Sequence, residues 1–285
     1  MSIPKIIHQI WFQGEEYIPD HLKAYHQSWI VKNPTFKVKV WDEKTIQQEV
    51  DSFPDKDVRD MYTNYRYMIQ KIDLAKYIIL YKYGGIYIDM DTDCLQGISD
   101  EFLDANEIIL SKLEFNILHN IAFALVGHNP TEDIINNGTI MVSPNNQIML
   151  YTIEEGKKNK DSFFYYLNKT LYVFSSIGPI CLTVATKKYK QEHPEAKIKI
   201  LDETYFEACN IIQVKGDCKP PPHAIGLHLY ESSWLSDTDK FLLNIYHFLA
   251  KYLLLILLFI FVLVYIFYLK PKKVFKKISF LKFLG

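Results

Sequence analysis

Residues 62–94 decide the fold of this chain, and they read YTNYRYMIQKIDLAKYIILYKYGGIYIDMDTDC. Apolar residues recur at helical spacing in the first half of this stretch and predict a helix. They are Met68, Ile72, Ala75 and Ile79. Gly84 and Gly85 then end the helix, because a glycine adopts the left-handed conformation without a Cβ clash. Residues 86–88 follow as a short apolar strand, so the stretch predicts a helix, a glycine turn and a strand.

Three carboxylates follow the predicted strand directly, at Asp89, Asp91 and Asp93. Alternate side chains of an extended chain point to the same face, so we expect these groups to lie together. Carboxylates this close repel one another unless a cation or a proton neutralises them. Mg²⁺ and Mn²⁺ prefer oxygen ligands, and ligands of open α/β sheets bind beyond the carboxyl ends of strands. The pattern therefore predicts a divalent-metal site.

The rest of residues 1–240 predicts one α/β domain. Residues 5–12 are apolar and β-branched, as in a buried strand. Residues 34–41 alternate apolar and polar side chains, as in a second strand. Residues 43–51 are polar and are expected to be helical. No internal repeat and no Pro-, Gly- or Ser-rich linker divides the region.

The C-terminal region differs in composition. Residues 252–269 carry no charge and would span roughly 27 Å as a helix, close to the thickness of a bilayer. We expect residues 241–269 to form a stem and one transmembrane helix; the alternative is a buried core helix. Residues 270–285 hold six lysines and form a basic tail. The basic tail favours a cytoplasmic position for the tail, whereas the lack of an export signal favours a cytoplasmic position for the domain. The two lie on opposite sides of the predicted span, so its orientation stays open.

Composition excludes several classes of protein. The formal net charge is −1 and the aromatic fraction is 15 %, which excludes a mainly disordered chain. Without the basic tail the net charge of the rest is −7, so we expect no nucleic-acid partner. Four cysteines are too few for a disulfide scaffold. Cys209 and Cys218 either form a disulfide or remain free thiols.

The acidic stretch fits two other motifs less well. A calcium loop that starts at Asp89 needs Gly at its sixth and Glu at its twelfth position, and the chain has Cys94 and Asp100 there. A phosphatase of the haloacid-dehalogenase type would begin D-x-D-x-[TV] after an apolar strand. Asp93 occupies the fifth position instead, so the phosphatase remains the second candidate enzyme.

Four segments give the chain a family resemblance. The first is Ile3–Trp11, IPKIIHQIW. The second combines Ser28-Trp29, Asn33-Pro34 and Trp41, the third runs from Asp73 to Asp91, and the fourth is His228 with Ser233-Trp234. These segments resemble the DXD-containing glycosyltransferases that include fungal initiating α-1,6-mannosyltransferases and the catalytic subunits of inositol-phosphoceramide mannosyltransferase. More distantly the chain is similar to the glucosylating clostridial toxins.

The resemblance implies a fold, a reaction and a cofactor. It implies a GT-A-type single domain, a Rossmann-like mixed sheet flanked by helices. It also implies a hexose, such as mannose, moved with retention of configuration from a UDP- or GDP-sugar donor. The acceptor would be a lipid headgroup or a glycan near a membrane. The implied metal is Mn²⁺ or Mg²⁺.

The resemblance also implies roles for individual residues. Asp89 and Asp91 are the expected catalytic residues, with Asp89 on the ribose or sugar and Asp91 on the metal. His228 is the expected third metal ligand, and Asp93 is a further candidate ligand. The other expected nucleotide-sugar-binding residues are Trp11, His8, Asp73, Lys76, Gly84, Gly85 and Trp234. Lys76 stands where the family has Arg and lacks the planar fork that grips a diphosphate in two places.

The sequence thus predicts a single-pass membrane glycosyltransferase of an ER/Golgi-type endomembrane, with no protein partner. The haloacid-dehalogenase-type phosphatase is one alternative. A catalytically dead, membrane-anchored transferase fold is the other, and Lys76 favours it most. Asn136-Asn137 and Gly178-Pro179 fall where the family has similar elements.

Overall fold

The computed structural model describes residues 2–113, 132–163, 168–209, 211–214, 216–231 and 233–269. It divides into two compact units, Met1–Glu231 and Ser232–Gly285. The boundaries predicted at residues 240 and 269 stay predictions. The predicted basic tail, residues 270–285, lies outside the described residues.

A mixed six-stranded sheet forms the centre of the first unit, in the order β2-β1-β3-β6-β5-β7. Its strands are β1 (Ile6–Ile10), β2 (Lys37–Trp41), β3 (Gly85–Ile88), β5 (Ile108–Lys112), β6 (Ile135–Val142) and β7 (Ile198–Leu201). Strand β1 lies between β2 and β3 and runs parallel to both, whereas β6 runs antiparallel to β3 and β5. The carboxyl ends of β1 and β3 therefore meet at one edge of the sheet.

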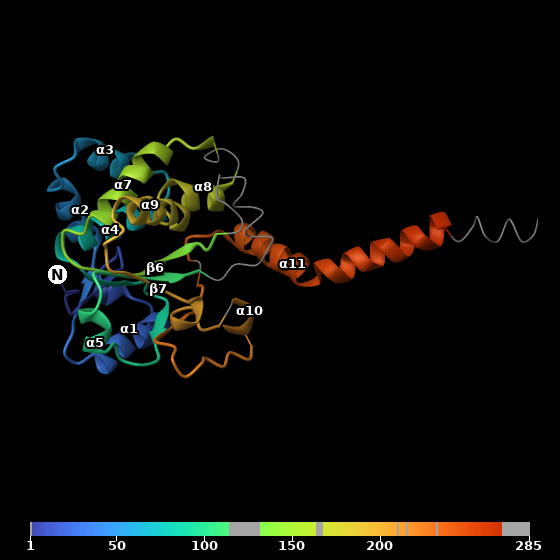
Figure 1. The fold of residues 1–285 in the computed structure, drawn as a ribbon, viewed down its shortest axis with the longest axis horizontal. Coiled ribbons are helices and arrows are strands. Elements are labelled where there is room, and N and C mark those ends of the chain that lie inside the picture. Colours follow the sequence, from blue (N-terminus) through green and yellow to red (C-terminus); the bar gives the residue numbers. More distant parts are fainter. Residues whose placement is uncertain are drawn as a thin grey trace, which may run out of the picture. The chain divides into compact units, whose positions relative to one another are not determined.

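Helices cover both faces of this sheet (Figure 1). One face carries α2 (Glu43–Asp51), α3 (Lys56–Asn64), α4 (Met68–Tyr83), α7 (Gln147–Asn159), α8 (Lys169–Ser176) and α9 (Pro179–Glu192). The other carries α1 (Asp20–Lys32), α5 (Asp100–Asp104) and the short α10 (Ile211–Val214). Each face has its own apolar core, one built around Leu74 and Ile78 of α4 and the other around Trp29 of α1. The predicted mixed α/β architecture is confirmed.

The predicted helix, glycine turn and strand are present as α4, Gly84-Gly85 and β3. Gly84 has φ +60° and Gly85 has φ +94°, values that favour glycine. A Cβ on Gly84 would lie 2.5 Å from the backbone nitrogen of Pro144, and one on Gly85 would lie 2.6 Å from the carbonyl oxygen of Ile6. Glycine is thus required both for the turn and for close backbone packing.

Helix α4 is buried over more of its surface than its apolar stripe indicates. Residues 73–80 are all buried, including the charged Asp73 and Lys76. Met68, which the predicted stripe included, is instead 49 % exposed because it begins the helix. Two opposite charges inside an apolar helix have to be paired to be tolerated, and this pair lies beside the functional site.

The chain turns sharply after β3. The backbone N–H of Thr92 donates to the carbonyl of Asp89 (3.1 Å), which closes a tight turn over Met90 and Asp91. Strand β4 (Thr92–Cys94) follows and pairs antiparallel with β8 (Gly226–His228) in a separate two-stranded sheet, with Thr92 opposite His228. The extended course expected for residues 89–93 is therefore interrupted, and Asp93 lies on a different strand from β3.

The second unit is dominated by α11 (Asp237–Val264), which Ser236 and Asp239 begin with a capping box. Five further residues, Tyr265–Leu269, continue as a π-helix. The predicted transmembrane helix over residues 252–269 is wrong: no helix in the described parts of the chain combines the length and the apolarity that a bilayer span needs. The uncharged stretch is α-helical only from Tyr252 to Val264, about 20 Å, whereas a span needs roughly 30 Å.

Candidate functional site

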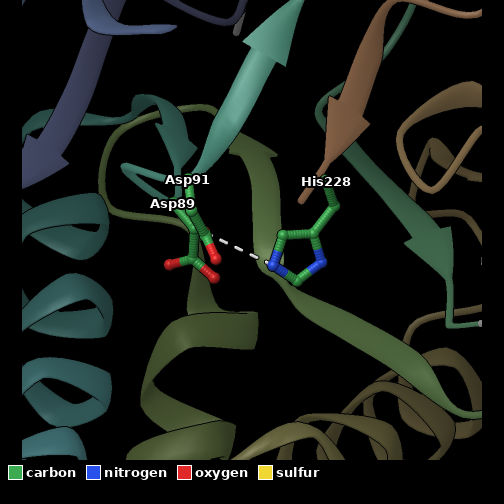
Figure 2. Close-up of side chains that lie close together, drawn as sticks. All are labelled: Asp89, Asp91 and His228. Carbon is green, nitrogen blue, oxygen red and sulfur yellow. Dashed lines mark ion pairs between the residues drawn. The ribbon is translucent and has the colours of Figure 1, made fainter. Parts of the chain in front are cut away.

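Asp89, Asp91 and His228 come together beyond the carboxyl end of β3. One ligand atom from each lies within 4.8 Å of the other two, and all three side chains are half-buried. Figure 2 shows the carboxylates of Asp89 and Asp91 next to each other and the His228 ring facing them from β8. The turn after β3 supplies the two acids, and the β4–β8 pairing brings in the histidine.

Both oxygens of Asp91 have partners. Oδ1 lies 3.4 Å from Nε2 of His228, and Oδ2 accepts a hydrogen bond from the backbone N–H of Glu231 at 3.0 Å. Burial by itself would raise the pKa of Asp91, but the neighbouring His228 outweighs it and lowers the pKa below its usual value. Asp91 is therefore a stable carboxylate at neutral pH.

His228 lies between two carboxylates. Its Nε2 faces Asp91, and its Nδ1 lies 3.3 Å from Oε1 of Glu207, a residue whose side chain is fully buried. Burial lowers the pKa of His228, but Asp91 and Glu207 outweigh burial and hold the pKa well above its usual value. The imidazolium thus partly offsets the negative charge of the acids. A metal cation bound to the neutral ring in place of the proton would do the same.

Asp89 is held by strand β3 and by β6. The hydroxyl of Tyr87 donates to Oδ1 of Asp89 at 2.8 Å, and the backbone N–H of Asp89 donates to the carbonyl of Gly138 at 2.9 Å. A Cβ on Gly138 would lie 2.5 Å from Oδ2 of Asp89. Gly138 therefore leaves the space that the Asp89 carboxylate occupies.

A buried ion pair adjoins Asp89. The Nζ of Lys76 lies 2.7 Å from Oδ1 of Asp73, 4.0 Å from Oδ1 of Asp89, and 2.9 Å from the carbonyl of Asn137, to which it donates. The side-chain amide of Asn137 donates to Asp73 at 3.0 Å. Burial raises the pKa of Asp73 to about 6, and the Lys76 ammonium limits the increase. The predicted helix face of Asp73 and Lys76 does point at the acidic site.

Two further predicted residues lie in the neighbourhood of the cluster. Trp11 follows β1, packs against the apolar cluster of Ile18, Leu22 and Met90, and donates through Nε1 to the carbonyl of Tyr17 at 3.1 Å. Part of its ring is exposed, so the predicted contact with a nucleotide base stays a prediction. Asp93 lies on β4 opposite Leu227, and it is not among the three residues whose ligand atoms converge.

The structure places three predicted nucleotide-sugar contacts away from the cluster. Gly84 and Gly85 lie at the amino end of β3, the opposite end from Asp89. His8 is buried, with Nε2 2.9 Å from the carbonyl of Gly84 and Nδ1 accepting from Trp41 at 3.1 Å. Burial lowers the pKa of His8 to about 4, so it is a neutral core residue. Trp234 belongs to the second unit, and its role stays a prediction.

Some residues of the site carry no signal in the sequence. Glu207 joins β8 through an isolated bridge to Leu227, and Tyr230 and Asn136 both contact its carboxylate. Nothing in the sequence around Glu207 marks it, because its partners come from distant segments. Tyr87 could have been found, since it lies two residues before Asp89 on the same strand.

The donor set of Asp89, Asp91 and His228 fits a divalent cation. Two carboxylate oxygens and one imidazole nitrogen suit Mn²⁺ and Mg²⁺, and three protein ligands would leave coordination positions open for a phosphorylated compound. The surrounding charges agree, because a cation would relieve the repulsion between the two acids.

Comparison with known proteins gives this site a family context. Residues 19–112 match the family described as "Glycosyltransferase sugar-binding region containing DXD motif". An uncharacterized glycosyltransferase of Acanthamoeba polyphaga mimivirus is 29 % identical over 81 % of this chain and 84 % of its own length. A mannosyl phosphorylinositol ceramide synthase of Saccharomyces cerevisiae is 28 % identical over 72 % of this chain, and the match spans 48 % of that relative.

Among solved structures, mouse xyloside xylosyltransferase 1 aligns with 80 % of this chain and 98 % of its own, at 14 % identity and a TM-score of 0.47. The chain spans about half the length of the yeast relative. The matched segment includes the helix, glycine turn, strand and both acids of the DXD motif. The resemblance stated from the sequence and the predicted enzyme class are thus confirmed: residues 19–112 match the glycosyltransferase sugar-binding region that contains the DXD motif.

Proposed function

We propose that this protein is a metal-dependent, retaining hexosyltransferase that uses a UDP- or GDP-sugar donor, with mannose as the expected sugar. The observation that carries the proposal is the convergence of Asp89, Asp91 and His228 within 4.8 Å. Two acids that follow a strand supply the metal ligands, and a histidine from a distant strand completes the set. The mannosyltransferase names of the fungal relatives support the choice of sugar.

Each group around the site has a proposed task. Asp91 and His228 would hold Mn²⁺ or Mg²⁺, with Asp89 as the third ligand or as the contact to ribose or sugar. The cation, when bound, supplies positive charge to the leaving nucleoside diphosphate. Lys76 would add charge next to Asp89, and its pairing with Asp73 keeps its position defined. Trp11 would stack on the base through its exposed part.

The acceptor is proposed from the relatives alone. One group of relatives is named for inositol phosphoceramide and another for initiation-specific α-1,6-mannosyl transfer. We therefore propose a hydroxyl of a lipid headgroup or of a glycan as the acceptor. A screen of both acceptor classes with the preferred donor distinguishes them, because only one should increase the rate of nucleotide release.

We also propose an oxidising, ER/Golgi-type compartment. Cys209 and Cys218 form a disulfide, which decides between the two states that the sequence left open, and disulfides persist in such compartments. A thiol-labelling assay on protein taken from its native cells tests this. If the unreduced protein is labelled at two cysteines fewer than the reduced protein, the proposal is supported. Equal labelling of the two samples contradicts it.

A donor-hydrolysis screen tests the activity. Purified protein with Mn²⁺ is incubated with UDP- and GDP-sugars, and release of nucleoside diphosphate is measured with and without EDTA. Release with one donor, lost in EDTA and in Asp91→Asn, supports the proposal. Phosphate release from phosphomonoesters would instead indicate the phosphatase, and no rise in melting temperature with Mn²⁺ and nucleotide would indicate a dead fold.

A further inference from the structure

Glu207 is the most buried carboxylate near the site, and it contacts the ring of His228. Its side chain is fully buried and lies between the two sheets of the first unit. A buried carboxylate is tolerated only where hydrogen bonds satisfy it. Oε1 accepts from the side-chain amide of Asn136 at 3.0 Å, and Oε2 accepts from the hydroxyl of Tyr230 at 3.2 Å.

The third partner of Glu207 is Nδ1 of His228, 3.3 Å from Oε1. Asp91 is an acceptor on the Nε2 side, but a cation held by Asp91 would take that position. Glu207 would then keep the remaining proton of the imidazole on Nδ1, which leaves the lone pair of Nε2 for the cation. Nε2 is the nitrogen that faces Asp91 at 3.4 Å. The ring is also flanked by Tyr230, whose ring centroid lies 4.4 Å from that of His228. Glu207 and Tyr230 thus restrict both the tautomer and the tilt of the ring.

Asn136 connects Glu207 to the other half of the site. Its Oδ1 accepts from the backbone N–H of Gly138 at 2.6 Å, and the carbonyl of Gly138 accepts from the backbone N–H of Asp89. The carboxylate of Glu207 therefore joins the strand that positions Asp89 to the strand that carries His228. This arrangement fixes the separation of two proposed metal ligands that come from different sheets.

We propose that Glu207 is a positioning residue for a divalent-metal site, acting through Nδ1 of His228 to present Nε2 to the cation. The inference rests on the proposed function, since it concerns the same metal. Outer carboxylates that hold a ligating histidine commonly contribute ten- to hundredfold in metal affinity. Glu207 faces Nδ1, the ring nitrogen that does not face Asp91, so its effect should appear in metal affinity first.

Mn²⁺ affinity of the whole protein, measured by electron paramagnetic resonance without any donor, tests this inference. Glu207→Gln has nearly the same shape but no charge, and its Mn²⁺ Kd should rise about ten- to hundredfold. Glu192→Gln is the matched control: it makes the same change on α9, where Glu192 accepts from Tyr151, and should leave the Kd unchanged. A Kd for Glu207→Gln within twofold of wild type, in protein that melts cooperatively, overturns the inference.

A double-mutant cycle separates positioning from a general structural effect. If Glu207 acts through His228, the variant with both Glu207→Gln and His228→Ala should bind Mn²⁺ no more weakly than His228→Ala alone. Additive losses overturn the inference. Wild-type protein that fails to bind Mn²⁺ overturns the proposed function itself, which distinguishes the two failures.

Nitrogen-15 NMR of wild-type protein saturated with diamagnetic Mg²⁺ needs no variant and applies even if Glu207→Gln fails to fold. A protonated Nδ1 on His228 is expected in this state, and a protonated Nε2 with a bare Nδ1 contradicts the inference.

Discussion

The ammonium group of Lys76 lies 2.7 Å from a carboxylate oxygen of Asp73, and the two side chains are only 2 % and 4 % exposed. The pair sits on the face of α4 that points at Asp89. It therefore has two tasks: it keeps two charges stable inside the fold, and it places a positive charge next to the acidic site. The stability of the fold and the chemistry of the site can be tested separately at this pair.

Replacement of Lys76 by Met should destabilise the protein strongly. Methionine has a similar length but leaves Asp73 buried without its cation, and breaking such a pair costs about 3–5 kcal/mol. The free energy of unfolding from urea titration at pH 7 measures the loss. Lys158→Met is the matched control, because Lys158, whose side chain is 58 % exposed, pairs with Glu155 three residues away, and it should change the free energy little. Equal losses in the two variants would contradict the prediction.

The buried carboxyl of Asp73 should make stability depend on pH. Burial raises the pKa of Asp73 to about 6, so the folded state binds a proton that the unfolded state has already released. The contribution of Asp73 to stability is therefore most favourable below about pH 4 and declines as pH rises through about 6. The free energy of unfolding of wild type minus that of Asp73→Asn, measured from pH 4 to 7, should fall by about 2–3 kcal/mol. A constant or rising difference would show that the group does not titrate in this way.

Asp91→Asn should abolish transfer while the fold stays intact. The variant removes a carboxylate that faces His228, so nucleotide release should fall at least about a hundredfold and the Mn²⁺-induced rise in melting temperature should disappear. Asp93→Asn is the matched comparison two residues away. Because Asp93 lies outside the converging group of Asp89, Asp91 and His228, the Mn²⁺ Kd of Asp93→Asn should stay within about threefold of wild type. Equal losses would place Asp93 among the ligands.

Mn²⁺ binding should strengthen as pH rises. The carboxylates hold the pKa of His228 well above its usual value, so a cation has to displace a proton from Nε2. Below that raised pKa, the affinity should increase nearly tenfold for each pH unit. Calorimetry in two buffers of different ionisation enthalpy counts the released proton. No proton release at pH 6, which lies below the raised pKa of His228, would mean that His228 is not a ligand.

Gly138→Ala should disturb the metal site more than the fold. The new methyl group would meet Oδ2 of Asp89 at 2.5 Å, and the side chain of Asp89 can move where a backbone atom cannot. We expect a weaker Mn²⁺ affinity with a small change in melting temperature. In Gly156→Ala the new group would meet the side chain of Ile177 in the core. This variant should melt at a lower temperature and keep its Mn²⁺ affinity. Unchanged Mn²⁺ binding in Gly138→Ala would contradict the tight fit at Asp89.

Local patterns predicted much of this structure. Apolar spacing, two glycines and a short β-branched run are enough to specify α4, the turn and β3, because each depends on residues adjacent in the chain. The same logic failed at the C-terminus. Eighteen uncharged residues of nearly bilayer length predicted a membrane span, yet the α-helix ends at Val264 and no described helix is long and apolar enough to cross a bilayer.

The sequence by itself determined the helix, the glycine turn and the strand that present Asp89 and Asp91, together with the resemblance that named His228. Only the tertiary structure decided which side chains share the site. The register that sets Thr92 opposite His228 excludes Asp93 from the converging group, and the bridge from Glu207 to Leu227 brings in a carboxylate with no sequence signal. The physical reason is that pairing between distant strands depends on the packing of the whole sheet, which no local pattern of residues encodes.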